Sequence, residues 1–217
     1  IPQLFSPTYN HQQTKDRPPT CPKLCRSDPG RSTGPLPAVG RLIRSGTDRG
    51  IRLHRTSGAV NTFVRKVPDR TAPVLDMGCG TGLAGKPLDQ TGYDHIDGID
   101  LSPEMLGKAS ALNVYRQLWE GDLTAAIDVQ PIYQALICVG VFSHKPDQPF
   151  LIPKLLDCLL PGGLVIATVN GKGWRDIGWV ELLEESQRQN EFKLESVDDI
   201  GYLTKQGIDG KLLTIGV

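Results

Sequence analysis

Apolar runs of strand length alternate with helical segments between about residues 70 and 170. This alternation is typical of a mostly parallel sheet with helices on both faces. The run 135–139 contains only Ala, Leu, Ile, Cys and Val, so it predicts a strand that is covered on both sides. Strands are expected at residues 73–77, 95–100, 115–120, 133–141 and 164–169, with shorter candidates at 193–197 and 211–217. The sequence therefore predicts an α/β fold built on a doubly wound sheet.

Helices are expected between these strands, at residues 83–90, after Ser102, at 149–160 and at 179–189. Ser102 stands before Pro103 and Glu104, which is a helix start signal, because the serine hydroxyl can accept a hydrogen bond from a free backbone N–H. Pro161-Gly162-Gly163 predicts a turn into the strand at 164–169.

The first 55 residues differ in character from the rest. They are rich in proline, arginine and small polar residues and show no helical or alternating apolar periodicity. Val60, Phe63, Val64 and Val67 then stand at helical spacing and predict a short helix before the first strand. We expect a disordered or loosely attached extension over residues 1–55 and one domain over residues 56–217.

Charge and hydropathy give little indication of a macromolecular partner. Lys plus Arg and Asp plus Glu both total 24, so no bulk charge points to nucleic acid or to an anionic membrane. No run approaches the roughly 18 apolar residues of a membrane-spanning helix, and no signal-peptide pattern is present. The sequence predicts a soluble, cytoplasmic protein that acts on a small molecule.

Five cysteines are present, an odd number that fits a reducing compartment. Cys21 and Cys25 form a C-x3-C pair, but no second pair of Cys or His follows at a spacing suited to zinc. No metal site is therefore predicted.

A glycine-rich segment follows the first expected strand. Val74-Leu75-Asp76 leads into Gly78, Gly80 and Gly82, with Cys79 between the first two glycines. Glycine at such a turn lets backbone N–H groups approach a ligand closely, because no Cβ stands in the way. The segment predicts a ligand-binding loop.

Two ligands fit the spacing of this loop. Gly80-Thr81-Gly82-Leu83-Ala84-Gly85 is a G-x-G-x-x-G sequence with Asp100 twenty residues after Gly80, as in NAD(P)-dependent oxidoreductases. Asp76 favours S-adenosylmethionine (SAM) instead. A carboxylate there repels a pyrophosphate but can accept a hydrogen bond from the ammonium group that SAM presents.

Asp100 ends the second expected strand, and Asp122 follows the third. Asp100 can accept hydrogen bonds from both hydroxyls of a ribose, and Asp122 can meet the exocyclic amine of an adenine. Each also has a purely structural interpretation, Asp100 as a helix cap or exposed loop residue and Asp122 as a turn residue after Gly121.

Five segments together resemble one superfamily: 74–82, 99–106, 121–123, 138–144 and 161–163. They are similar to class I SAM-dependent methyltransferases and, more narrowly, to the methyltransferase-like family named for the Williams-Beuren syndrome region. The resemblance covers about residues 58–217. It implies a Rossmann-like sheet of seven strands, mostly parallel, whose last strand, at 211–217, inserts antiparallel.

The resemblance also assigns cofactor-binding roles. Asp76, Gly78, Cys79, Gly80 and Gly82 would surround the methionine portion of SAM. Asp100 would hold the ribose. Leu101 and Met105 would lie against the adenine, and Asp122 and Leu123 would meet its edge. Cys138 and Val139 would end the fourth strand beside the methionine portion.

Catalysis by such a protein needs little beyond orientation of the reacting groups. His144, on the loop after the fourth strand, is the candidate general base if the acceptor must lose a proton. Relatives usually carry an aromatic, acidic lid segment before the first strand, and residues 1–55 show none. A SAM-binding protein without catalytic activity therefore stays open as an alternative.

Overall fold

The computed structural model describes residues 50–124, 132–143, 151–189, 192–203 and 208–217. Cys21, Cys25 and His144 lie outside these residues. The strands are β1 (Val74–Met77), β2 (Ile96–Asp100), β3 (Gln117–Glu120), β4 (Tyr133–Phe142), β5 (Leu159–Asn170), β6 (Lys193–Leu203) and β7 (Ile208–Gly216). The helices are α1 (Gly50–Lys66), α2 (Gly85–Gln90), α3 (Pro103–Ser110), α4 (Leu151–Leu156), α5 (Gly171–Ile177) and α6 (Trp179–Arg188).

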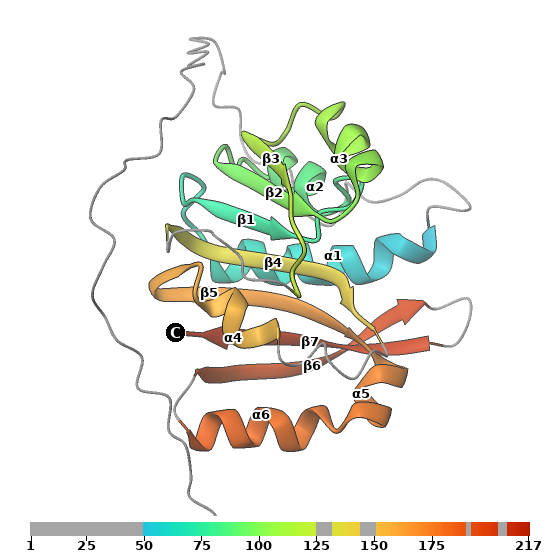
Figure 1. The fold of residues 1–217 in the computed structure, drawn as a ribbon, viewed down its shortest axis with the longest axis vertical. Helices are drawn as coiled ribbons and strands as arrows, with labels where there is room; N and C mark the ends of the chain where they lie inside the picture. Colours follow the sequence, from blue (N-terminus) through green and yellow to red (C-terminus); the bar gives the residue numbers. More distant parts are fainter. Residues whose placement is uncertain (1–49, 125–131, 144–150, 190–191, 204–207) are drawn as a thin grey trace, which may run out of the picture. The chain divides into compact units, whose positions relative to one another are not determined.

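The described strands form one seven-stranded sheet in the order β3-β2-β1-β4-β5-β7-β6 (Figure 1). Strands β3, β2, β1, β4 and β5 are parallel to one another. Strand β7 lies antiparallel between β5 and β6. The predicted fold class is confirmed, including the antiparallel last strand.

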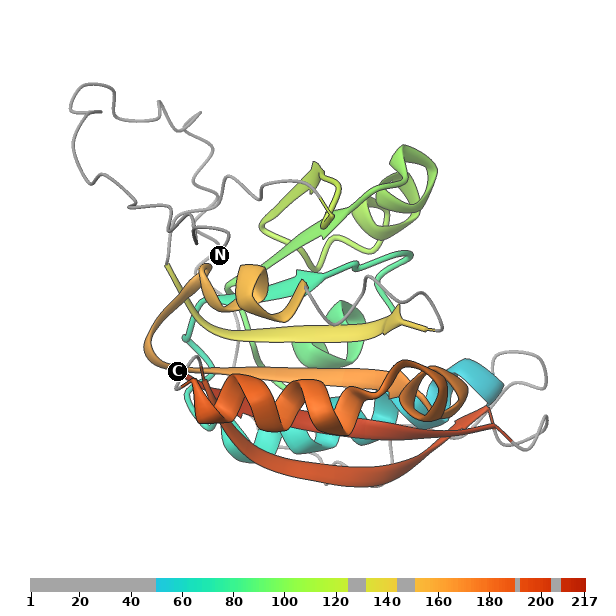
Figure 2. The same ribbon diagram turned by 60° about the horizontal axis from the view of Figure 1, so that its bottom comes forward.

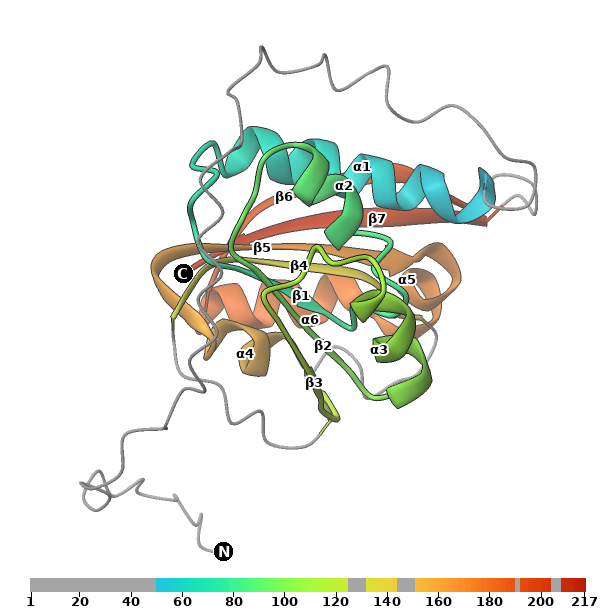
Figure 3. The same cartoon turned by 90° about the horizontal axis from the view of Figure 1, so that it is seen from above.

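Apolar side chains alternate between the two faces of β4, as the unbroken apolar run predicted. Ala135 and Ile137 pack on the face covered by α1 and α2, together with Phe63 of α1 and Leu88 of α2. Leu136 and Cys138 face the opposite side, where α4 and α6 lie (Figure 3). Every one of these side chains is fully buried or nearly so. The central strand therefore joins two separate hydrophobic cores.

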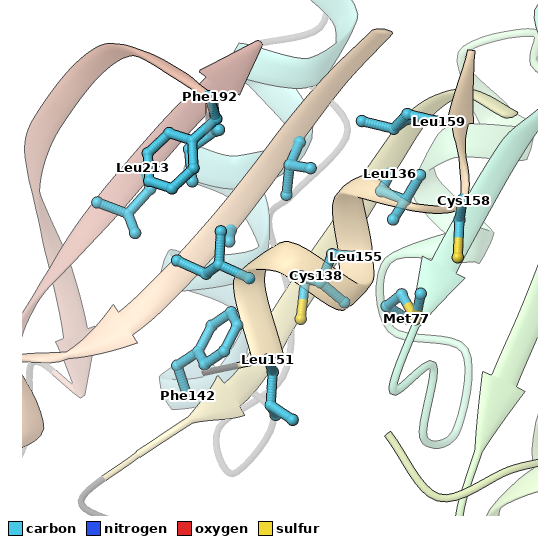
Figure 4. Close-up of a cluster of buried hydrophobic side chains, with 14 of the residues drawn as sticks. Met77, Leu136, Cys138, Phe142, Leu151, Leu155, Cys158, Leu159, Phe192 and Leu213 are labelled. Carbon is cyan, nitrogen blue, oxygen red and sulfur yellow. The ribbon is translucent and has the colours of Figure 1, made fainter. Parts of the chain in front are cut away.

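The core on the α4 and α6 face extends to the antiparallel strand. Figure 4 shows Met77 toward one end of it, Phe192 with Leu213 at the other, and Cys138 and Leu155 between them. Trp179 at the start of α6 is fully buried and meets Phe142 edge to face, with the ring centroids 5.3 Å apart. Helix α6 thus packs against the β7 side of the sheet (Figure 2).

Several element boundaries differ from the predicted ones. Helix α2 begins at Gly85, not at residue 83, because a series of turns separates it from β1. Strand β5 begins at Leu159, and the predicted turn at 161–163 lies inside it as a bulge, since the pairing moves from Tyr133–Leu159 to Ala135–Leu164. Helix α5 was not predicted, since its sequence begins Gly-Lys-Gly. Asn170 makes that helix possible by accepting hydrogen bonds from two of its first N–H groups.

Helix α1 is longer than the predicted helix and begins at Gly50, before residue 56, where the domain was expected to start. The division of the chain into an extension and a domain stays a prediction. None of the described helices has the length and apolar character needed to cross a membrane.

We expect Leu213→Ala in β7 to lower the free energy of unfolding by about 2–5 kcal/mol, because a fully buried leucine leaves a cavity between β7 and the helices. Val180→Ala on α6 is the control: Val180 is exposed, so the change should stay within about 0.5 kcal/mol. Urea unfolding followed by circular dichroism measures both. Equal effects would contradict the assignment of β7 to the core.

Candidate functional site

The loop from β1 to α2 is tied to the neighbouring strand by its backbone. The N–H groups of Gly78 and Cys79 both donate to the carbonyl oxygen of Ile99 on β2, at 2.8 and 3.0 Å. Gly78, Gly80 and Gly82 have φ angles of 71°, 55° and 80°. Residues with a Cβ rarely adopt such angles, so the three glycines determine the shape of the loop.

The space around these glycines differs from one to the next. A Cβ placed on Gly78 would collide with the side chain of Val141, and one on Gly82 would lie 2.5 Å from Leu112 Cδ1. A Cβ on Gly80 would have no atom within 4 Å apart from those of Gly80 and its two chain neighbours. The loop is therefore packed at both ends and open at Gly80, which leaves room for a ligand against the backbone there.

Asp100 at the end of β2 holds this open point in place. Its Oδ2 accepts a hydrogen bond from the Gly80 N–H at 2.8 Å, and its Oδ1 accepts one from the Ser102 N–H at 2.9 Å. The two oxygens of a carboxylate offer about four acceptor sites, so further donors can still bind. Asp100 thus supports the loop, and its predicted contact with a ribose stays a prediction.

The segment after Asp100 presents an apolar surface. Leu101 is 63% exposed, and Met105 on α3 is half-buried. The Ser102 hydroxyl accepts a hydrogen bond from the Met105 N–H at 3.3 Å, so the predicted helix cap is confirmed. An exposed leucine beside a carboxylate suits the flat face of a base attached to a ribose.

Asp76 lies under the loop and is only 1% exposed. Its Oδ2 accepts a hydrogen bond from the Tyr115 hydroxyl at 2.6 Å. Burial raises the pKa of Asp76 to about 7, an increase that the hydrogen bonds from Tyr115 and Gly85 oppose and the charge of Asp100 reinforces. The predicted contact of Asp76 with an ammonium group stays a prediction.

Asp122 and Leu123 come directly after β3. Asp122 is exposed, and its Oδ1 accepts hydrogen bonds from the N–H and the hydroxyl of Thr124, at 2.8 and 2.7 Å. This is the turn geometry that the structural interpretation predicted. Leu123 reaches toward Gly78, since a Cβ there would lie 3.9 Å from Leu123 Cδ1. Leu123 therefore borders the glycine loop, on the side of β3.

The end of β4 corrects one expectation. Cys138 and Val139 do not end the strand, which continues to Phe142. The pairing moves from Cys138–Ala167 to Phe142–Val169, so residues 139–141 form a bulge. Gly140, with a φ of 83°, donates its N–H to the hydroxyl of Thr168 at 3.0 Å. The bulge carries Val141 against Gly78.

Neither cysteine near the loop has the character of a nucleophile. Cys138 is fully buried among apolar side chains beside Met77 (Figure 4), and Cys79 is 5% exposed. Burial raises the pKa of both thiols well above the ordinary range, and the charge of Asp76 raises it further. Both therefore stay protonated thiols. Among the described residues, no cluster of three or more His, Cys, Asp or Glu side chains could bind a metal.

Two residues that shape the site could not be identified from the sequence. Tyr115 was placed in the third strand, but it precedes β3 and bonds to Asp76 across 39 residues of sequence. Thr168 was counted as part of an apolar strand, but its hydroxyl holds the β4 bulge. The signal for Thr168 was a hydroxyl inside a fully buried strand, since such groups need a partner. No signal in the sequence identified the partner of Tyr115.

Several solved structures with a similar fold are SAM-dependent methyltransferases. The magnesium protoporphyrin IX methyltransferase of Synechocystis PCC 6803, with bound S-adenosylhomocysteine, matches with a TM-score of 0.60 at 17% identity, over 82% of this chain and 90% of that chain. A SAM-dependent methyltransferase from Mesorhizobium loti matches with a TM-score of 0.57 at 16% identity, over 73% and 98%. The chain has the Rossmann-like fold of class I SAM-dependent methyltransferases.

Its sequence also matches a family profile, described as a methyltransferase domain, over residues 49–202. The chain therefore belongs to this methyltransferase family, and the predicted class, a SAM-dependent methyltransferase, is confirmed. The NAD(P)-dependent oxidoreductase that the spacing of Gly80 to Gly85 left open is set aside. The position of β7 between β5 and β6 also argues against an oxidoreductase, since dinucleotide-binding sheets have the strand order 3-2-1-4-5-6.

Individual relatives match about half of the chain. The ubiquinone biosynthesis O-methyltransferase of Xylella fastidiosa (strain 9a5c) is 36% identical over 115 residues, 49% of this chain and 45% of the relative. The trans-aconitate 2-methyltransferase of Pseudomonas aeruginosa (strain UCBPP-PA14) is 32% identical, over 51% and 39%. Human methyltransferase-like protein 27 is 33% identical, over 46% and 42%. The match thus spans less than half the length of these relatives.

Two alanine substitutions test the geometry of the loop. Gly80 and Gly82 both have positive φ angles, but only Gly82 lacks room for a Cβ. We expect Gly82→Ala to lower the free energy of unfolding by about 1–3 kcal/mol more than Gly80→Ala does, through overpacking against Leu112. Urea unfolding of the two variants gives the difference. A larger loss for Gly80→Ala would mean that the described packing of the loop is wrong.

Proposed function

We propose that this chain is an active class I methyltransferase that binds SAM at the loop from β1 to α2 and transfers its methyl group to a small molecule. The observation that carries the proposal is the hydrogen bond from the Gly80 N–H to Asp100. It joins an open stretch of glycine backbone to a carboxylate at the carboxyl end of the adjacent strand. Ligands of open α/β sheets bind at this edge.

The residues around the loop suit each part of SAM. Open backbone at Gly80 suits the methionine portion, with Gly78, Gly82 and Cys79 forming the rest of the loop and Asp76 beneath it. Asp100 would accept the ribose hydroxyls. The adenine would lie between two groups of side chains: Leu101 and Met105 on one side, and Asp122 and Leu123 on the other. Cys138 would contribute only as a core residue behind the site, and Val139 through the backbone of the bulge.

SAM supplies a methyl group on a positively charged sulfur, which a nucleophile displaces in one step. The task of the protein is therefore to orient the acceptor in line with the methyl group, a contribution that can reach about 7–11 kcal/mol. Where the acceptor must lose a proton, we assign the role of general base to His144, which follows β4 and lies outside the described residues.

A small molecule is the acceptor that we favour. One relative is named as a ubiquinone biosynthesis O-methyltransferase, and another as a trans-aconitate 2-methyltransferase. The net charge of zero does not indicate a polyanionic acceptor such as RNA.

The narrower membership in the methyltransferase-like family named for the Williams-Beuren syndrome region is also a proposal, supported by the five motif segments. A cytoplasmic location of the protein is likewise a proposal.

Calorimetric titration of the purified chain with SAM, S-adenosylhomocysteine and NAD in parallel tests the cofactor. We expect micromolar binding of the first two and none of NAD. Binding of NAD alone would overturn the proposal. Binding of SAM without methyl transfer to any member of a panel of hydroxylated and carboxylated small molecules would identify a SAM-binding protein without catalytic activity.

Replacing Asp100 tests the ribose contact. We expect Asp100→Asn to weaken SAM binding by about 10- to 100-fold, because hydrogen bonds to a charged group contribute about 1.5–3 kcal/mol. Asp94→Asn is the control, since Asp94 is an exposed carboxylate just before the opposite end of β2. An Asp100→Asn variant that binds SAM as tightly as the wild type would remove Asp100 from the site.

A further inference from the structure

One aromatic ring lies against glycines from three different elements. A Cβ on Gly82 in the loop would lie 3.2 Å from Tyr115 Cε2, and one on Gly98 of β2 would lie 3.1 Å from Tyr115 Cδ1. A Cβ on Gly85, the first residue of α2, would overlap the Tyr115 hydroxyl. The absence of side chains at these three positions thus makes room for the ring of Tyr115 beside the loop.

The hydroxyl of this ring bonds to the buried carboxylate under the loop. Tyr115 donates to Asp76 Oδ2 at 2.6 Å, and the backbone N–H of Gly85 also bonds to Asp76. Both donors are electrically neutral. A carboxylate buried among neutral groups is expensive to ionise, so each hydrogen bond that favours the charged form matters.

We propose that Tyr115 is a positioning residue of the cofactor site, which acts through Asp76 by keeping that carboxylate ionised beneath the glycine loop. This inference rests on the proposed function, because its consequence concerns SAM. Both the ammonium and the sulfonium groups of SAM are positively charged. An ionised Asp76 attracts them, whereas a protonated Asp76 does not.

The other titratable groups facing Asp76 do not replace Tyr115 in this role. From β2, Asp100 is negatively charged and disfavours a second negative charge nearby. From the loop and from β4, Cys79 and Cys138 are buried thiols whose raised pKa keeps them neutral. Burial likewise raises the pKa of Tyr115 far above its ordinary range, so its hydroxyl keeps the proton that it donates.

The direction of the pH effect follows from these contacts. Asp76 has a pKa of about 7, so SAM affinity rises as the pH increases through 7 and Asp76 loses its proton. Removing the Tyr115 hydroxyl removes a group that lowers the pKa of Asp76, so the increase in SAM affinity occurs at higher pH. A lost hydrogen bond to a charged group corresponds to a shift of about 1–2 pH units.

The test is the Kd for SAM between pH 6 and pH 9 in wild type and Tyr115→Phe, a variant that keeps the ring and removes the hydroxyl. We expect binding about 5- to 50-fold weaker at pH 7 and within about 2-fold of wild type at pH 9. Tyr93→Phe is the matched control. Tyr93 is fully buried on the same face of the sheet, but its hydroxyl donates to Val67 O, so its removal should leave the pH profile unchanged.

Each outcome decides the inference. An equal loss of affinity at every pH, or no loss, would show that Tyr115 only fills space and would overturn it. If Tyr115→Phe does not fold, Asp76→Asn takes its place. That carboxamide cannot ionise, so its SAM affinity should not rise with pH, and a profile that still rises overturns the inference. A wild-type chain that binds no SAM at any pH overturns the proposed function itself.

Discussion

The hydrogen bond between the Asp100 carboxylate and the Gly80 N–H is the contact on which the site depends. It connects the end of β2 to the middle of the loop that follows β1, and the two bonds to Ile99 O hold the start of the same loop. Strands β1 and β2 are parallel neighbours, so their carboxyl ends meet at one edge. The sheet therefore determines where the loop lies, and the carboxylate determines which way its backbone faces.

The features that sequence could predict are those with a local physical signature. An apolar run without alternation indicated the buried strand β4, because a strand with helices on both faces has no polar side. Glycines at alternate positions after Asp76 indicated a tight loop, and the structure gives these glycines positive φ angles. Ser102 indicated a helix start, since its hydroxyl can satisfy a free N–H. These signals gave the fold class and the position of the loop.

The features that sequence missed depend on contacts between distant segments. The bulge at 139–141 exists because a Thr168 hydroxyl on the next strand accepts the Gly140 N–H. The bond from Tyr115 to Asp76 requires that glycines of the loop, of α2 and of β2 leave the same space empty. Gly82 and Gly85 belong to one glycine motif, but nothing in the sequence connects them with Gly98 or with Tyr115. Periodicity and propensity describe one segment at a time, so such pairs appear only in the folded chain.

The place of β7 has a consequence for the order in which the sheet can form. Strand β6 precedes β7 in the chain, yet within the described sheet it pairs only with β7. A ribosome therefore completes β6 before its partner in the folded sheet, β7, exists. Until β7 emerges and inserts, β5 presents an open, largely apolar edge to the cell. Such edges recruit other chains, so the interval between synthesis of β5 and insertion of β7 is when the nascent protein is most exposed to misassembly.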